Sequence, residues 1–141
     1  ISSSIGHKLM NENPFSNTRF DLARNNISRL KEIFKSGHLD DFINLTESEA
    51  LMIHSLMLSS NPYFILMKPN TLEVIQRVLE FRRETKLPIS FTLDAGSNVH
   101  LLYPISVKES IQKFIEADLL KFCKSNTHIH DSLGMGSEKL M

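Results

Sequence analysis

The sequence predicts an α+β domain, in which a small and mainly antiparallel sheet carries helices packed on one face. Two patterns lead to this fold class. Apolar residues recur at helical spacing through residues 20–79, whereas residues 89–103 alternate between apolar and polar on either side of an Ala-Gly-Ser-Asn break. The first pattern indicates amphipathic helices and the second indicates two strands joined by a tight turn. Strands joined in this way run antiparallel, and helices before and after them can cover the sheet.

Two helices are expected in the first half of the chain. The first has Ser16 or Asn17 as its N-cap and ends at Gly37, with a stripe made of Phe20, Ala23, Ile27, Leu30, Ile33 and Phe34. The second begins near Asp40 and runs to about Leu58, with an apolar side made of Phe42, Ile43, Ala50, Ile53, Met57 and Leu58. The connection between them is short, so we expect the two helices to pack antiparallel.

A third helix is expected after a break at residues 59–62. Residues 63–67 form a short apolar run that predicts a buried strand or a tight turn. Asn70 then caps the helix with Glu73 three residues later, which is capping-box spacing, and Pro88 follows its end. The apolar stripe of this helix consists of Leu72, Ile75, Val78 and Leu79.

The hairpin and a last helix complete the predicted fold. In the first strand Ile89, Phe91 and Leu93 face the core and alternate with polar residues. Ser106 and Glu109 form a capping box for the last helix, whose inward residues are Ile111, Phe114, Ile115 and Leu119. Residues 127–131 alternate like a further strand.

Composition excludes several classes of protein. The length of 141 residues fits one domain, and sixteen basic residues balance sixteen acidic ones, which argues against nucleic-acid binding. Cys123 is the single cysteine, so a disulfide framework is excluded and a reducing, cytoplasmic location is expected. No apolar run approaches the roughly 20 residues that span a bilayer. The chain begins at Ile1 without an initiator Met, so we expect it to be part of a longer protein.

The motifs of metal, nucleophile and nucleotide chemistry are missing. No histidine has HExxH spacing and one cysteine cannot build a thiolate zinc site, so no metal site is expected. His128 and His130 share a strand face near Asp131, a pair that can chelate a metal but more simply lies on a surface strand. No Gly-x-Ser-x-Gly elbow, GxxxxGK[ST] loop or GxGxxG turn occurs. If the protein uses ATP, we expect the ATP site to lie outside this chain.

Two polar segments remain as candidate sites. The run Ser2-Ser3-Ser4-Ile5-Gly6 is either a flexible end or an anion-binding loop, in which hydroxyls and free backbone N–H groups face a phosphate. Asp94 ends the first strand of the hairpin beside Ala95, Gly96, Ser97 and Asn98. It is either a turn cap or an acid that a stiff strand presents to open space.

The hairpin turn resembles a known family. Residues 92–99 read Thr-Leu-Asp-Ala-Gly-Ser-Asn-Val and resemble the Thr-Phe-Asp-Ala-Gly-Pro-Asn-Ala/Val signature of diphosphomevalonate decarboxylases. The Asp-Ala-Gly-x-Asn core distinguishes these enzymes within the GHMP kinase superfamily. The Ser-rich opening resembles the loop at which their second domain begins, and Glu47 to Ala50 with His54 resemble their polar helix. The resemblance covers nearly the whole chain but only the C-terminal half of a full-length family enzyme.

The resemblance implies an ATP-dependent decarboxylase of the mevalonate pathway of isoprenoid biosynthesis. Such an enzyme converts mevalonate 5-diphosphate to isopentenyl diphosphate, CO2, ADP and phosphate. Residues 1–141 would form its C-terminal domain, with the GHMP kinase C-terminal fold. ATP and Mg²⁺ would be bound mainly by an N-terminal domain absent from this chain, so the chain alone is expected to be inactive. The implied partners are the small-molecule substrate, that N-terminal domain and a second copy in a homodimer.

The resemblance also implies roles for individual residues. Asp94 matches the catalytic aspartate, which contacts the 3-hydroxyl of the substrate and is proposed as its general base. Ser3 and Ser4 match contacts to the substrate diphosphate, although some members carry Arg in place of Ser4. The substrate-binding turn comprises Ala95, Gly96 and Asn98, with Ser97 in place of the family's proline. At Gly96 the implied requirement is positive φ and close backbone approach.

Two alternatives remain open from the sequence. One is a related superfamily enzyme, either a mevalonate monophosphate decarboxylase or a kinase. The other is a non-catalytic α+β binding domain, since the expected helices and hairpin suit it equally well. A Pro-x-x-x-Gly-x-x-Ser-Ser phosphate loop upstream of Ile1 would favour the enzyme.

Overall fold

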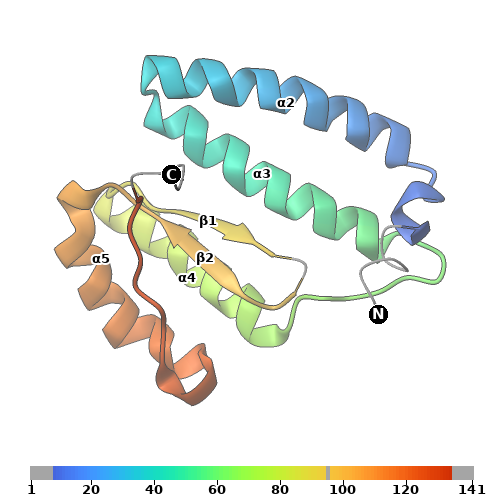
Figure 1. Cartoon of the computed structure of the whole chain (residues 1–141). Helices are drawn as coiled ribbons and strands as arrows, with labels where there is room; N and C mark the ends of the chain where they lie inside the picture. Colours follow the sequence, from blue (N-terminus) through green and yellow to red (C-terminus); the bar gives the residue numbers. More distant parts are fainter. Residues whose placement is uncertain (1–7, 95, 135–141) are drawn as a thin grey trace, which may run out of the picture.

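The computed structural model describes residues 8–94 and 96–134. Figure 1 shows its helices and strands in chain order, which are α2 (Ser16–Ser36), α3 (Leu39–Leu58), α4 (Pro69–Thr85), β1 (Ser90–Leu93), β2 (Val99–Leu102) and α5 (Lys108–Phe114). Residues 8–11 are also helical, and short helical turns continue from α5 through Ile115–Leu119, Leu120–Phe122 and Lys124–Asn126. The structure confirms the α+β fold class.

The hairpin is the centre of the main core. Strands β1 and β2 pair antiparallel, with Phe91 opposite Leu101 and Thr92 opposite His100. Helix α3 lies alongside β1 (Figure 1). The predicted inward residues of β1 are buried together with residues of α4, α5 and the turn after α5, namely Val74, Ile75, Val78, Ile111, Phe114, Ile115 and Leu119. Burial of each large apolar side chain here stabilises the fold by about 1.5–3 kcal/mol.

Helices α2 and α3 pack antiparallel, as their short connection predicted (Figure 1). Gly37 ends α2 in the left-handed conformation, at φ 72°, and its N–H donates to the Ile33 carbonyl over 2.8 Å. The predicted N-caps are wrong. Phe15 occupies the N-cap of α2 because the Asn13 carboxamide accepts the Phe15 N–H over 2.9 Å, and His38 rather than Asp40 precedes α3.

The predicted apolar stripe of α2 is only partly buried. Ile33 is buried, whereas Ile27 and Phe34 are 58% and 68% exposed. Helix α2 packs mainly against one neighbour, α3, so its contact is narrower than its stripe. Part of that contact is polar, because Glu49 of α3 accepts hydrogen bonds from Arg19 and Asn26 of α2, each over 2.6 Å.

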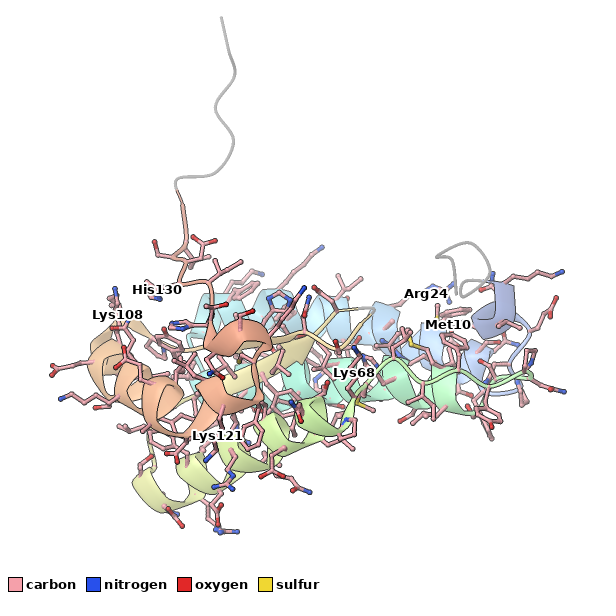
Figure 2. The ribbon with its side chains drawn as sticks, turned by 90° about the horizontal axis from the view of Figure 1, so that it is seen from below. Met10, Arg24, Lys68, Lys108, Lys121 and His130 are labelled. Atoms are coloured by element: carbon pink, nitrogen blue, oxygen red, sulfur yellow. The ribbon has the colours of Figure 1, made fainter. Side chains whose placement is uncertain are left out.

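A second, smaller core closes the other end of the α2–α3 pair. It consists of Met10, Leu56, Met57 and Phe64. Figure 2 shows Met10 at the opposite end of the molecule from Lys108, which begins α5. Residues 63–67 form no strand. Phe64 alone of this run is buried, with its N–H donating to the Met57 carbonyl over 3.2 Å, so the run is an irregular connection.

The start of α4 differs from the prediction. Lys68, not Asn70, is the N-cap, and its N–H donates to the Thr71 hydroxyl over 3.1 Å. Asn70 instead donates to the Phe122 carbonyl over 3.0 Å and ties α4 to the turns after α5. Of the predicted stripe, Ile75 and Val78 are buried, whereas Leu72 and Leu79 are 48% and 42% exposed.

The last part of the chain confirms the helix but not the strand. All four predicted inward residues of the last helix are buried. The capping box at Ser106 does not form, because a 3-10 turn (Ile105–Val107) precedes α5 and Glu109 pairs with Lys113 over 2.9 Å. Residues 127–131 are exposed and form no strand in the described structure, with Ile129 95% exposed. Alternation of apolar and polar residues is therefore not sufficient for a strand, which also needs a paired neighbour.

Candidate functional site

Asp94 directly follows β1 at the open end of the hairpin. Its carboxylate side chain is 62% exposed. Its backbone, by contrast, is held, because the Asp94 carbonyl lies 3.1 Å from His54 Nε2 and accepts the Gly96 N–H over 2.7 Å. A fixed backbone with an exposed carboxylate suits an acid that must meet a ligand from outside the domain.

His54 is the support beneath this position. It lies on α3 and is 2% exposed, so the imidazole is packed inside the domain. A carbonyl oxygen can only accept a hydrogen bond, so Nε2 must carry the imidazole proton. Such a buried and hydrogen-bonded imidazole has a structural role within the domain. The structure adds its partner, which is the backbone of Asp94 itself.

The other side of the turn is tied to α4. The Thr71 hydroxyl donates to the Ser97 carbonyl over 2.9 Å, and Thr71 is 3% exposed. Two helices therefore hold the hairpin end, α3 through His54 and α4 through Thr71. Thr71 was not anticipated from the sequence, because its pairing joins positions 26 apart and leaves no local pattern.

Gly96 has open space around it on this domain, since a Cβ at this position would meet nothing within 4 Å. Positive φ at Gly96 and close approach of its backbone to a ligand stay predictions. Gly96 and Asn98 do lie in the same turn as Asp94, as expected. Ser3, Ser4 and Ala95 lie outside the described residues.

His100 brings a second imidazole to the site. Its Nε2 lies 2.8 Å from Asp94 Oδ2 across the hairpin, and its side chain is 50% exposed. The sequence contained the signal for this pairing. Alternation places Thr92 and Asp94 on one face of the strand, and His100 is the partner of Thr92 in the register.

Glu47 and Arg82 brace the opposite end of β1. Arg82 donates to Glu47 with both terminal nitrogens, over 3.0 Å at Nη2, and to the Ile89 carbonyl over 2.7 Å. The hydrogen bond to Glu47 raises the pKa of Arg82 above its ordinary value, against the opposing effect of burial. Both partners lie at the far end of the strand from Asp94. Glu47, part of the polar helix that resembled the family, is therefore a structural residue.

The described residues do not offer a metal site. No group of three or more His, Cys, Asp or Glu side chains in residues 8–94 and 96–134 could hold an ion. Mg²⁺ prefers oxygen ligands. The neighbour of the Asp94 carboxylate is the nitrogen of the His100 imidazole, so it does not add a second oxygen ligand. His128 and His130 do not lie on a strand, so the shared strand face that was predicted for them does not form. Figure 2 shows His130 on the segment beyond the turns after α5.

Two further features lie apart from Asp94. Burial raises the pKa of the Cys123 thiol, which argues against a nucleophile. An open hollow of about 560 Å³ is lined by Asp40, Ile43, Leu79, Arg82, Arg83, Lys86, Leu87 and Pro88. Pro88 precedes β1 whereas Asp94 follows it, so the hollow and the carboxylate belong to opposite ends of the strand.

In the described part of the chain, no helix is both long and apolar enough to cross a membrane.

A comparison with protein families tests the resemblance that the hairpin turn suggested. Residues 2–139 match the mevalonate 5-diphosphate decarboxylase C-terminal domain. The chain belongs to this family. The predicted family is thereby confirmed, and the alternative of a non-catalytic α+β binding domain is not favoured. The role of Asp94 within the family signature stays a prediction.

Solved structures agree with the family. The mevalonate diphosphate decarboxylase from Enterococcus faecalis aligns with 86% of this chain at 26% identity and a TM-score of 0.79. That from Legionella pneumophila aligns with 84% at 29% identity and a TM-score of 0.78. A third match, MDDEF in complex with MVAPP, AMPPCP and magnesium, covers 86% at 26% identity and a TM-score of 0.80. No curated protein matches the chain.

The aligned region is part of each solved protein. It covers 38% of the Enterococcus and Legionella structures and 37% of the MDDEF complex. The chain thus spans less than half the length of each solved protein, and the TM-scores show that its fold matches that of the aligned part.

Proposed function

We propose that residues 1–141 form the C-terminal domain of an ATP-dependent decarboxylase that converts mevalonate 5-diphosphate to isopentenyl diphosphate, CO2, ADP and phosphate. The observation that carries the proposal is Asp94, an exposed carboxylate on a backbone that His54 anchors, within the Asp-Ala-Gly-x-Asn turn. Family membership and the MVAPP and AMPPCP bound in a similar structure support it.

In the proposed reaction the tertiary 3-hydroxyl of the substrate gives its proton to Asp94 as its oxygen takes the terminal phosphoryl group of ATP. The carbon–oxygen bond of the new phosphate then breaks and the phosphate leaves with its electron pair. The bond to the carboxylate carbon breaks next, and its electrons form the double bond of isopentenyl diphosphate while CO2 departs. Positioned proton transfer of this kind typically contributes about 10²–10⁴-fold to a rate.

The remaining roles follow from the turn and the N-terminal segment. Ala95, Gly96 and Asn98 would contact the substrate beside Asp94, and Ser3 and Ser4 would contact its diphosphate. Mg²⁺ would neutralise phosphate charge during phosphoryl transfer. We assign ATP and Mg²⁺ mainly to an N-terminal domain of the full-length protein, because the family resemblance implies it. We also expect the full-length protein to form a homodimer.

The test is a substrate panel on the full-length protein. We expect CO2 release from mevalonate 5-diphosphate with ATP and Mg²⁺, and much slower release from the monophosphate. Faster release from the monophosphate, or ADP formation without CO2, would assign the protein to the alternative superfamily activities. The 141-residue chain alone should neither hydrolyse ATP nor release CO2.

A further inference from the structure

The Asp94 carboxylate has a side-chain partner that the reaction scheme does not use. His100 Nε2 lies 2.8 Å from Asp94 Oδ2, which is the distance of a strong hydrogen bond between a nitrogen and a carboxylate. Among the described residues, no other side chain bonds to this carboxylate. His100 is thus placed to affect the acid directly.

The hairpin fixes this pair by its register. His100 belongs to β2 and stands opposite Thr92, two residues before Asp94. Side chains two residues apart share a strand face, so Asp94 and His100 are diagonal neighbours on one face. His54 of α3 anchors the Asp94 carbonyl over 3.1 Å. The backbone and the carboxylate are therefore held by different imidazoles.

The hydrogen bond from His100 makes the two carboxylate oxygens of Asp94 different, because only Oδ2 takes part in it. A carboxylate accepts hydrogen bonds, so His100 Nε2–H is the donor and Oδ2 is occupied. Oδ1 remains to accept the proton of an incoming hydroxyl. An unpaired carboxylate with 62% of its surface exposed would instead rotate among rotamers and present either oxygen.

We propose that His100 is a positioning residue for the decarboxylase reaction, which holds Asp94 Oδ2 so that Oδ1 meets the substrate hydroxyl. This inference rests on the proposed function. His100 acts through Asp94 and does not itself touch the reacting atoms. The loss of one orienting hydrogen bond should lower kcat by about tenfold. KM should change little, because the diphosphate contacts lie elsewhere.

Three variants of the full-length enzyme separate the donor from the ring. His100→Phe keeps an aromatic ring in β2 but removes the N–H, and should lose about tenfold in kcat with KM within about threefold of wild type. His100→Gln places an amide N–H at a similar distance from the backbone and should recover most of that loss. His130→Phe makes the same substitution on the exposed tail and should leave both constants unchanged.

These experiments distinguish failure of the positioning role of His100 from failure of the proposed decarboxylase activity. If His100→Phe keeps wild-type kcat, or if Gln restores no more than Phe, the positioning role is wrong. In the Asp94→Asn background, His100→Phe should cause no further loss, and an independent tenfold loss there would also overturn the inference. If the wild-type enzyme does not turn over mevalonate 5-diphosphate at all, the proposed function fails instead.

Discussion

His54 should be one of the most costly single side chains to remove. His54→Ala deletes an imidazole that is 2% exposed and leaves the Asp94 carbonyl without its 3.1 Å partner. The lost hydrogen bond accounts for about 1 kcal/mol, and the cavity left by a ring of this size for about 2–4 kcal/mol. We therefore expect the free energy of unfolding of the chain to fall by about 3–5 kcal/mol.

Urea unfolding followed by far-UV circular dichroism measures this loss. With a slope of about 2 kcal/mol per molar urea, the midpoint should fall by about 1.5–2.5 M. His54→Gln keeps an N–H donor and much of the volume, so it should lose less than half as much. His38→Ala is the matched control, since His38 is 73% exposed at its side chain, and it should change stability by less than about 0.5 kcal/mol.

Unfolding of His54→Ala at the same urea concentration as His38→Ala would show that the His54 side chain adds nothing to stability. If His54→Gln is no more stable than His54→Ala, the lost stability comes from the cavity and not from the hydrogen bond to Asp94.

Three other predictions concern stability and reactivity. Arg82→Ala leaves the buried Glu47 carboxylate without its partner, so the free energy of unfolding in urea should fall by about 3 kcal/mol. Arg83 is exposed, and Arg83→Ala should lower it by less than about 0.5 kcal/mol. Equal losses in the two variants would contradict a stabilising role of the Glu47–Arg82 ion pair. Gly37→Ala should cost about 1 kcal/mol because φ is 72° with open space around the Cβ, and Gly37→Asn should cost less; a neutral Ala variant would argue against the left-handed cap. Burial raises the pKa of Cys123, so less thiolate forms at a given pH, and alkylation at pH 8 should be several-fold slower in folded than in urea-unfolded chain; equal rates would show that the thiol is open.

Local patterns predicted the parts of the fold that depend on neighbours in sequence. The hairpin followed from alternation about a turn, and its apolar residues Ile89, Phe91 and Leu93 are buried as expected. Gly37 ended its helix for an equally local reason, the left-handed conformation that glycine tolerates. These elements require no knowledge of the tertiary structure.

The predictions that were wrong concern features that depend on residues far away in the sequence. Phe34 and Ile27 belong to an apolar stripe, yet only tertiary packing decides which part of that stripe is covered. Asn70 had capping-box spacing but donates to a carbonyl 52 positions away. Residues 127–131 alternate like a strand, but they pair with neither strand of the described sheet.

The candidate site divides in the same way. The motif identified Asp94 and its turn, and the register of the hairpin would have placed His100 beside it. The anchoring of the turn by His54 and Thr71 required the structure, because both contacts come from other elements. The hydrogen bonds from α3 and α4 fix the backbone of the turn that carries Asp94, which the sequence motif alone could not show.

The most direct test of the account is Asp94→Asn in the full-length protein. Asn keeps the size of the side chain and removes the base, so the single-turnover rate of CO2 release should fall by at least about 100-fold. Binding of mevalonate 5-diphosphate should persist, and Asp131→Asn on the exposed tail should release CO2 at the wild-type rate. A rate within a few-fold of wild type for Asp94→Asn would contradict the assignment of Asp94 as the catalytic base.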